Sequence, residues 1–228
     1  MKKCFVILFA FALLLCAAVT ASATDTEAPG DGNTSVPVAA LKEDEMNQPE
    51  EITGSLGEEI RYVLRSDGRL EITGAGAMKT DADRSPFAGS DKIRSVVIGE
   101  GVTSICEEAF FCCTELTEVT FPDSLTAIGA NAFANCISLR TVPQPKNVRT
   151  VGEDAFANTP WYDALPDGPV YFGDLFLRYK GAAPKDTALV IKNGTAGLAD
   201  AALRNCRNIT SVTVPDGVTE IVYFCFSG

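Results

Sequence analysis

The chain has 228 residues, with 30 acidic and 19 basic side chains and a formal net charge of −11. It contains no histidine, which removes the usual general base at neutral pH and excludes hydrolase arrangements that need an imidazole. The excess of negative charge repels nucleic acid and anionic lipid at long range. Composition therefore disfavours catalysis of this kind and favours a cationic or neutral partner.

The N-terminus has the composition of a secretory signal peptide. The basic pair Lys2-Lys3 precedes an apolar run over residues 5–19, and the small residues 21–23 follow. This order predicts a signal peptide over residues 1–23, whereas the alternative, a retained membrane anchor, would need a longer apolar run. We therefore expect a secreted or cell-surface protein that does not insert into the membrane after signal cleavage.

Two further segments precede the repeats. Residues 24–51 are rich in Asp, Glu, Pro, Gly, Ser and Thr, and they cannot bury enough apolar surface to offset the entropy of ordering. They are predicted to be a disordered acidic spacer. Apolar residues then alternate on both sides of the turn at 66–68, which predicts a β-hairpin. We expect residues 52–92 to cap the open end of the repeats, because an uncovered end exposes apolar surface and strand edges.

Residues 93–228 contain a 23-residue repeat. The same residue types return at this interval in three sets: Ala109, Ala132 and Ala155; Phe110, Phe133 and Phe156; and Cys113 and Cys136. Repetition at a short fixed period predicts a solenoid, in which each unit buries its apolar face against its neighbours. The next match to this cysteine position, Cys206, lies 47 residues beyond Thr159, so one period carries a 24-residue insertion at about residues 160–184.

Each unit has the pattern of one short strand and one compact turn. Val119 and Phe121 alternate with Glu118 and Thr120, which predicts a strand with one buried face. A proline then ends the strand, and the later Ala-Phe pair predicts a short helical or 3₁₀ turn. Stacked units would form a parallel sheet along one side. Two departures from the pattern are Cys106, where the unit prefers glycine, and Gln144, where it prefers an inward aromatic residue.

These residues carry a family resemblance. The segments 102–113 and 116–136 resemble BspA-type leucine-rich repeats, and residues 68–78 are similar to the segment that often precedes the first repeat of that family. The insertion also resembles one that recurs in the family. The resemblance implies a β-rich α/β solenoid: a leucine-rich repeat superhelix with short parallel strands and short helical or 3₁₀ turns, preceded by a β-hairpin cap. It further implies a bacterial extracellular or cell-surface protein used for adhesion or ligand binding, without identifying the ligand.

Six cysteines follow the predicted signal peptide: Cys106, Cys112, Cys113, Cys136, Cys206 and Cys225. Three of them share one repeat position, where they are predicted to be small buried hydrophobic residues. The vicinal pair and the two off-pattern residues, 106 and 225, are the candidates for a disulfide, because secretion permits one. Without a CxxC pair or a histidine, we expect no zinc site, and we expect no cofactor.

Two surfaces are candidates for binding. The first is the outward strand face, whose side chains should lie in parallel rows: Ser95, Val97, Glu118, Thr120, Thr141, Val190, Ser211 and Thr213. The second is the aromatic insertion, represented by Trp161 and Tyr162, although its aromatics could instead pack a small core of their own.

We therefore expect a non-enzymatic secreted or cell-surface protein that binds an extracellular protein or glycan. The alternative is a structural spacer of a larger surface protein whose downstream module carries the activity. The last repeat stops before its cysteine position, so we expect a truncated C-terminal unit. The protein would then be a monomer or would stack end to end through that uncapped terminus.

Overall fold

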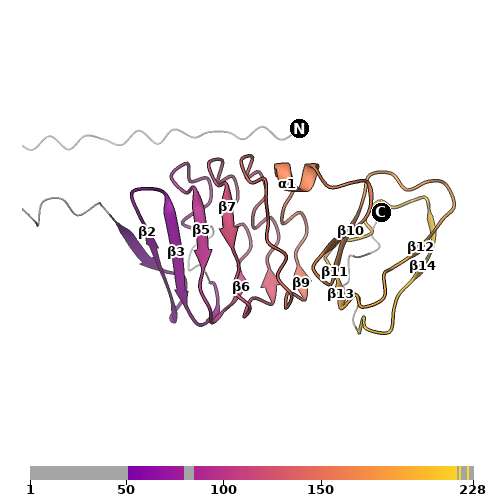
Figure 1. Cartoon of the computed structure of the whole chain (residues 1–228), viewed down its shortest axis with the longest axis horizontal. Coiled ribbons are helices and arrows are strands. Elements are labelled where there is room, and N and C mark those ends of the chain that lie inside the picture. The colour runs from indigo at the N-terminus through magenta and orange to yellow at the C-terminus, as the bar shows by residue number, and fades with distance from the viewer. Residues whose placement is uncertain (1–50, 80–84, 220, 222–224, 226–228) are drawn as a thin grey trace, which may run out of the picture. The chain divides into compact units, whose positions relative to one another are not determined.

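The structure of the chain is a computed structural model that describes residues 51–79, 85–219, 221 and 225. These residues belong to one compact unit, Asp44–Gly228 (Figure 1). The predicted signal peptide and the predicted spacer up to residue 50 lie outside the described residues. Within this unit, successive chain segments form a solenoid of about six turns.

The first sheet joins the hairpin to the repeats. Its strands, in spatial order, are β1 (Ile52–Ser55), β2 (Ile60–Leu64), β3 (Arg69–Gly74), β5 (Ser95–Ile98) and β7 (Glu118–Thr120). The pairs β1–β2 and β2–β3 are antiparallel, whereas β3–β5 and β5–β7 are parallel. The predicted hairpin cap is therefore present. Its second strand, β3, serves as the first rung of the parallel stack, with Leu70 and Ile72 buried.

The second sheet lies on another side of the coils and is entirely parallel. Its strands, in spatial order, are β4 (Gly76–Ala77), β6 (Val102–Ile105), β8 (Ala127–Ile128) and β9 (Thr150–Val151). A tight corner follows β8 and β9, at Gly129 and Gly152. A Cβ atom at Gly152 would lie 2.3 Å from the backbone nitrogen of Ala130, so the neighbouring coil leaves no room for a side chain there.

The turns between the sheets differ from the prediction, because the repeats contain no helix among the described residues. Asn131 and Asn135 both have positive φ, 53° and 62°, and two such residues four positions apart prevent a helical run. Successive backbone N–H groups in the turn alternate between two kinds of acceptor. The Ala134 N–H donates within the turn to the Asn131 carbonyl, whereas the Phe133 N–H donates to the Ala155 carbonyl of the next coil at 2.7 Å. The expected leucine-rich repeat solenoid of short parallel strands is confirmed, and only its α/β label is slightly off, because strands and hydrogen-bonded turns build the coils with almost no helix.

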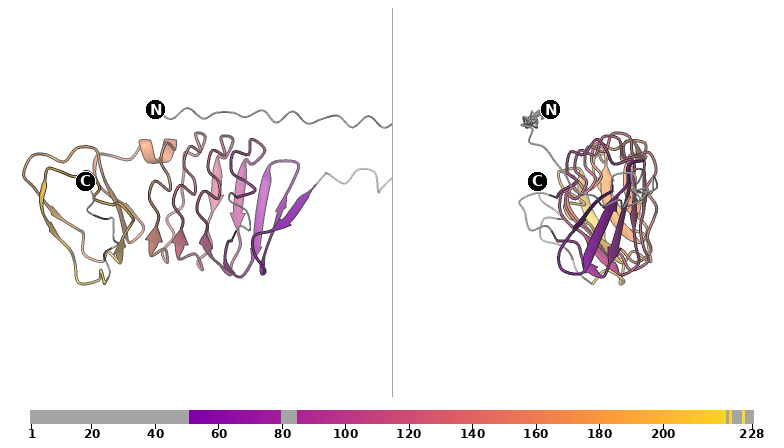
Figure 2. Two further views of the ribbon diagram at one scale, coloured as in Figure 1. Left: turned by 180° about the vertical axis from the view of Figure 1, so that it is seen from behind. Right: turned by 90° about the vertical axis from the view of Figure 1, so that its left-hand side faces the viewer.

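The coils of the repeats lie side by side in successive layers (Figure 2). Aromatic rings from these coils stack along the interior. The ring centroids of Phe110 and Phe133 are 5.1 Å apart, and those of Phe133 and Phe156 are 5.5 Å apart. Phe87 extends this stack toward the hairpin, 5.6 Å from Phe110. Offset-stacked and edge-on rings add to the stability given by their burial alone. Residues 23 positions apart therefore occupy equivalent heights in adjacent coils, as the repeat predicts.

The insertion adds a short helix and a hairpin. Helix α1 (Pro160–Asp163) leads to the antiparallel pair β10 (Gly168–Phe172) and β11 (Leu175–Lys180), and β11 pairs in parallel with β13 (Gly197–Leu198). A separate parallel pair, β12 (Thr187–Val190) and β14 (Ile209–Thr213), follows. Strand β11 is buried on both faces: Leu175 and Leu177 join the main apolar cluster, whereas Phe176 joins a second one. The interior is thus two clusters with β11 between them.

Candidate functional site

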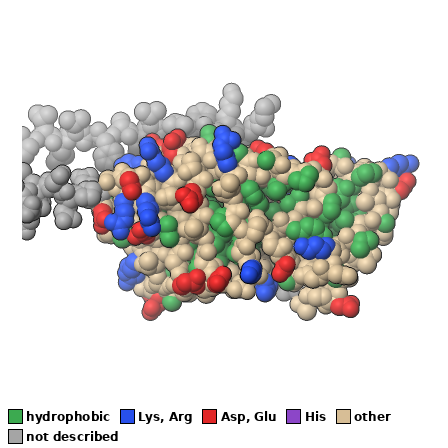
Figure 3. All heavy atoms as spheres, in the orientation of Figure 1, with side chains coloured by type: hydrophobic (Ala, Val, Ile, Leu, Met, Phe, Trp, Pro, Cys, Tyr) green, Lys and Arg blue, Asp and Glu red, His purple; other side chains and the backbone are tan. Residues whose placement is uncertain are grey.

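The outward face of the first sheet carries the predicted rows of side chains over β5 and β7. Ser95 lies opposite Glu118, and Val97 lies opposite Thr120, while the intervening Val96 and Val119 are buried. Because strand side chains alternate between faces, these four point away from the core. This part of the face shows interspersed charged and apolar side chains in Figure 3.

The rows do not continue across the whole molecule, contrary to the expectation of one parallel sheet. The first sheet ends at β7, and β12–β14 form a separate two-stranded sheet. Thr141 lies between them, exposed but outside any strand. The reason is the sequence that follows, in which Pro143 and Pro145 lack the N–H groups that a sheet ladder needs. Val190, Ser211 and Thr213 are exposed and belong to this separate two-stranded sheet.

Gln144 explains how the insertion is held at this break. Its side-chain oxygen accepts a hydrogen bond from the Gly173 N–H at 2.8 Å, in the turn between β10 and β11. The repeat pattern would place an inward aromatic side chain at position 144. Phe172 of the insertion supplies an aromatic ring to the interior instead, and it is fully buried beside Phe121 and Phe156. Gln144, which departs from the repeat pattern, therefore makes a direct contact between the repeats and the β10–β11 hairpin.

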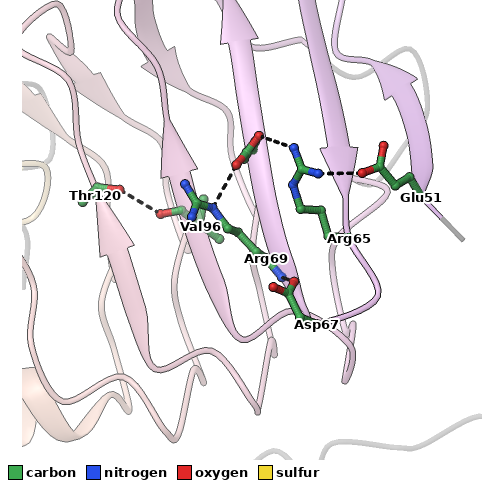
Figure 4. A network of polar contacts seen from close by, with 7 residues as sticks. Glu51, Arg65, Asp67, Arg69, Val96 and Thr120 are labelled. Carbon is green, nitrogen blue, oxygen red and sulfur yellow. Dashed lines mark hydrogen bonds and ion pairs between the residues drawn. The ribbon is translucent and has the colours of Figure 1, made fainter. Parts of the chain in front are cut away.

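A charged network extends the outward face into the hairpin, and sequence reasoning missed it. The Arg65 guanidinium contacts Glu51 at 2.6 Å and Glu71 at 3.1 Å, and Glu71 also contacts Arg69 at 2.9 Å (Figure 4). The hydrogen bond from Arg65 lowers the pKa of the Glu71 carboxyl. The strand register could have revealed this network. Glu71 lies opposite Val97 in the β3–β5 pairing, so its carboxylate belongs to the same outward row as Val97 and Thr120.

The polar side chains of the outward face differ in whether they already have a partner within the protein. The Thr120 hydroxyl donates to the Val96 carbonyl at 3.3 Å, so this group already has an internal acceptor (Figure 4). Both oxygens of the Glu71 carboxylate are likewise already engaged, one by Arg65 and the other by Arg69. Glu118 is exposed, and no ion pair is found for it within the described part of the chain. Among the candidates on this face, its carboxylate is the most available charged group.

The aromatic residues of the insertion pack against the repeats. The Trp161 ring lies 5.0 Å from that of Phe156 and 5.9 Å from that of Phe172, both edge-on. Tyr162 is half-buried against the main cluster, and the Lys180 ammonium lies 5.6 Å from its ring centroid. Both predicted site residues therefore contribute to the attachment of the insertion, and they expose only part of each ring.

A small hollow of about 30 Å³ lies where the insertion meets the repeats, lined in part by Asp154, Tyr162, Arg178 and Asp200. It is large enough for a water molecule but far below the volume of a pocket for an organic ligand. The Arg178 guanidinium contacts Asp154 at 2.9 Å across it. Burial raises the pKa of Asp200. The geometry fits a structural junction.

Two of the three repeat cysteines lie in the interior, as their spacing predicts, whereas the third, Cys206, is only half-buried. Cys113 and Cys136 are fully buried thiols, and each Sγ donates to a carbonyl of the preceding coil, that of Phe87 at 3.1 Å and that of Phe110 at 3.2 Å. Burial raises the pKa of Cys113 to about 12 and also raises that of Cys136. Cys106 and Cys225 are thiols as well, so neither candidate forms the disulfide allowed for them. Within the described residues no His, Cys, Asp or Glu cluster could hold a metal ion.

Short parallel strands, a fixed repeat and a ladder of buried aromatic rings define a repeat solenoid, and comparison with known proteins agrees. A family model described as the BspA type leucine-rich repeat region matches six copies over residues 80–163 and 184–228. The chain therefore belongs to the BspA-type leucine-rich repeat family. The matched ranges leave out residues 164–183, which cover most of the insertion. No curated protein matches the chain.

Several solved bacterial structures are similar in fold. A leucine-rich repeat protein from Eubacterium ventriosum is 22% identical with a TM-score of 0.47, and the match covers 75% of this chain and 61% of that one. The Treponema pallidum leucine-rich repeat protein is 23% identical with a TM-score of 0.38, over 68% and 79% of the two chains. A leucine-rich cell surface protein from Faecalibacterium prausnitzii is 22% identical with a TM-score of 0.36, over 76% and 45%. This chain thus spans less than two thirds of the first and third structures.

None of the helices in the described residues is long and apolar enough to cross a membrane.

Proposed function

We propose that this protein is a secreted or cell-surface binding protein without catalytic activity, and that it recognises an extracellular protein or glycan. The observation that carries the proposal is the ordered outward face of β5 and β7, where Ser95 and Val97 lie in register with Glu118 and Thr120. Repeat proteins use such rows as extended contact surfaces. The predicted signal peptide and the family membership support a location outside the cell.

A second candidate function is a spacer or scaffold that carries another module of a surface protein. The self-satisfied network of Arg65, Arg69 and Glu71 favours it, because charges that pair with one another contribute rigidity to the sheet and leave little for a ligand. The two functions differ in one respect that can be measured: only the first needs a partner that contacts the outward face.

The test is binding of the mature chain to arrays of extracellular proteins and glycans, followed by affinity measurement for any hit. Changing Glu118→Ala and Thr120→Ala together should weaken binding by about tenfold, which corresponds to ~1.4 kcal/mol. The matched control is Thr103→Ala with Glu107→Ala, which removes the same atoms from β6 and from the turn that follows it, away from this face.

Equal affinity of the two double variants would overturn the assignment of the face. Absence of any protein or glycan ligand in such arrays would favour the spacer instead.

A further inference from the structure

A sheet edge is left open at the point where the strand rows break. Strand β12 pairs with β14 on one side, and no strand among the described residues pairs with its other side. The exposed fraction of Val190 is 66%, which is unusual for a large apolar residue of a strand. Open edges of this kind are commonly blunted by charges, prolines or cover, because they can pair with another chain. Here the four residues Thr187–Val190 contain neither a charge nor a proline.

The direction of the backbone groups on β12 follows from its bonds to β14. The Ile191 N–H donates to the Thr213 carbonyl at 3.0 Å, so the backbone groups of Ile191 face β14. Because adjacent strand residues direct their N–H and C=O groups to opposite edges, those of Val190 face away from β14. No backbone partner for the Val190 groups is found in the part of the chain that the structure describes. A strand laid along this edge would satisfy them.

Side chains around the edge indicate the chemistry of the strand that would fit. Tyr171 of β10 lies at one end, where its hydroxyl accepts from the Lys192 N–H at 3.0 Å. The Lys192 ammonium lies 4.7 Å from the Tyr171 ring centroid, and it is exposed. Lys185, also exposed, precedes the other end of β12, and no hydrogen bond or ion pair is found for its ammonium within the described residues. Asp186, which is also exposed, lies between Lys185 and the strand. The apolar strip therefore has two cations and one carboxylate at its ends, with Lys192 the cation beside Val190.

We propose that β12 is a docking edge for an extended peptide segment with acidic residues, which adds as a third strand beside Val190. Its backbone would bond to the free groups of Val190, an apolar side chain would contact Val190 and Tyr171, and carboxylates would meet Lys185 and Lys192. This is recognition by strand addition, in which the backbone supplies affinity and alternate side chains supply specificity. The site is separate from Glu118 and Thr120, so its failure leaves the proposed function of the β5–β7 face untouched.

The test uses the mature chain and a capped seven-residue peptide in which valine and threonine alternate between two terminal glutamates. The Val190→Pro variant removes the edge N–H, which this protein does not use, and should weaken peptide binding at least tenfold. Edge strands tolerate proline when its nitrogen faces solvent. The matched control, Val190→Thr, keeps the N–H and should bind almost as well as the original chain. The same peptide with lysines in place of the glutamates should bind at least tenfold more weakly.

A second measurement protects the test against a misfolded proline variant. In the unchanged protein, saturating peptide should slow hydrogen exchange of the Val190 amide at least tenfold and leave that of Thr120 unchanged. Undetectable peptide binding, equal binding by the proline and threonine variants, or an unprotected Val190 amide would each overturn the proposal. A dimer that Val190→Pro converts to a monomer would also overturn it, because a second copy would then occupy the edge.

Discussion

Among single residues, the repeat position of Cys113 and Cys136 accepts either a thiol or a hydroxyl in the same turn. Cys113 and Cys136 fill it with thiols that donate to the preceding coil, and Thr159 fills it with a hydroxyl that donates to the Phe156 carbonyl at 2.8 Å. Cys206 occupies the same register position but is only half-buried, and its Sγ reaches the Arg204 carbonyl at 3.7 Å. A small side chain with a donor satisfies this position wherever the coils pack closely.

The two buried thiols predict that stability falls at alkaline pH. The folded state raises the pKa of Cys113 to about 12 and raises that of Cys136, whereas an unfolded cysteine titrates near pH ~8.5. The folded state therefore holds more protons between these values, so its advantage is complete below about pH 8.5 and is lost as pH rises. Each thiol should contribute a slope of about −1.4 kcal/mol per pH unit in this window.

The measurement is urea unfolding between pH 7.5 and 10.5. The Cys113→Ala, Cys136→Ala double variant should lose stability less steeply than the original chain, because tyrosines and lysines titrate equally in both. Parallel pH profiles for the two proteins would contradict a role for these thiols.

Among the secondary-structure elements, helix α1 starts the insertion, and Thr159 is its N-cap residue. Thr159 precedes α1, and its Oγ accepts from the Tyr162 N–H at 3.1 Å while donating to Phe156. A threonine cap satisfies an N–H that a helix start leaves unpaired, and proline at the first helical position fits without loss of a bond. The same position in two earlier coils holds cysteine, and those coils continue without a helix.

This difference predicts the effect of restoring the repeat residue. Thr159→Cys should lower the free energy of unfolding by about 1 kcal/mol, because a thiol is a weak acceptor for the Tyr162 amide. Hydrogen exchange should quicken at Tyr162 and leave β6 and β8 unchanged. The control Thr159→Ser keeps the hydroxyl and should behave like the original chain. Comparable losses in the cysteine and serine variants would show that the cap is unimportant.

At the scale of the whole described unit, β11 separates two apolar clusters. The main cluster runs from the hairpin through the repeats to Phe172, whereas Phe176, Leu189 and Leu203 belong to the second. Repeat proteins gain stability mainly from contacts between neighbours, so a division of the interior permits the two parts to open separately. The second cluster also supports β12, which carries the proposed docking edge.

Truncation of one ring in each cluster tests this division. Phe176→Ala should cost about 3–5 kcal/mol and should speed hydrogen exchange in β12 and β14 more than in β6 and β8. Phe133→Ala, the matched change in the main cluster, should show the opposite distribution. If either variant accelerated exchange equally in all four strands, the interior would unfold as one cooperative unit.

Much of this architecture followed from periodicity. The spacing of Phe110, Phe133 and Phe156 predicted rings at equal heights, and the alternation around Val119 predicted which side chains of β7 face outward. The expected short helical or 3₁₀ turns are present only as single turns with almost no helix, because residues such as Asn131 and Asn135 take left-handed conformations that a residue pattern alone does not display. The expected continuous row is interrupted at Pro143, because its missing N–H prevents a ladder bond between β7 and the next coil.

The repeat, its inward residues, the hairpin and the position of the insertion could be predicted from the amino-acid sequence, because they depend on the local spacing of apolar side chains. Three other features became visible only in the folded chain: Glu71 bridges Arg65 and Arg69, Gln144 bonds to the insertion, and β11 divides the interior. The open edge of β12 also belongs to this second group. These features depend on which segments, distant in the chain, come within bonding distance, and no local pattern specifies that.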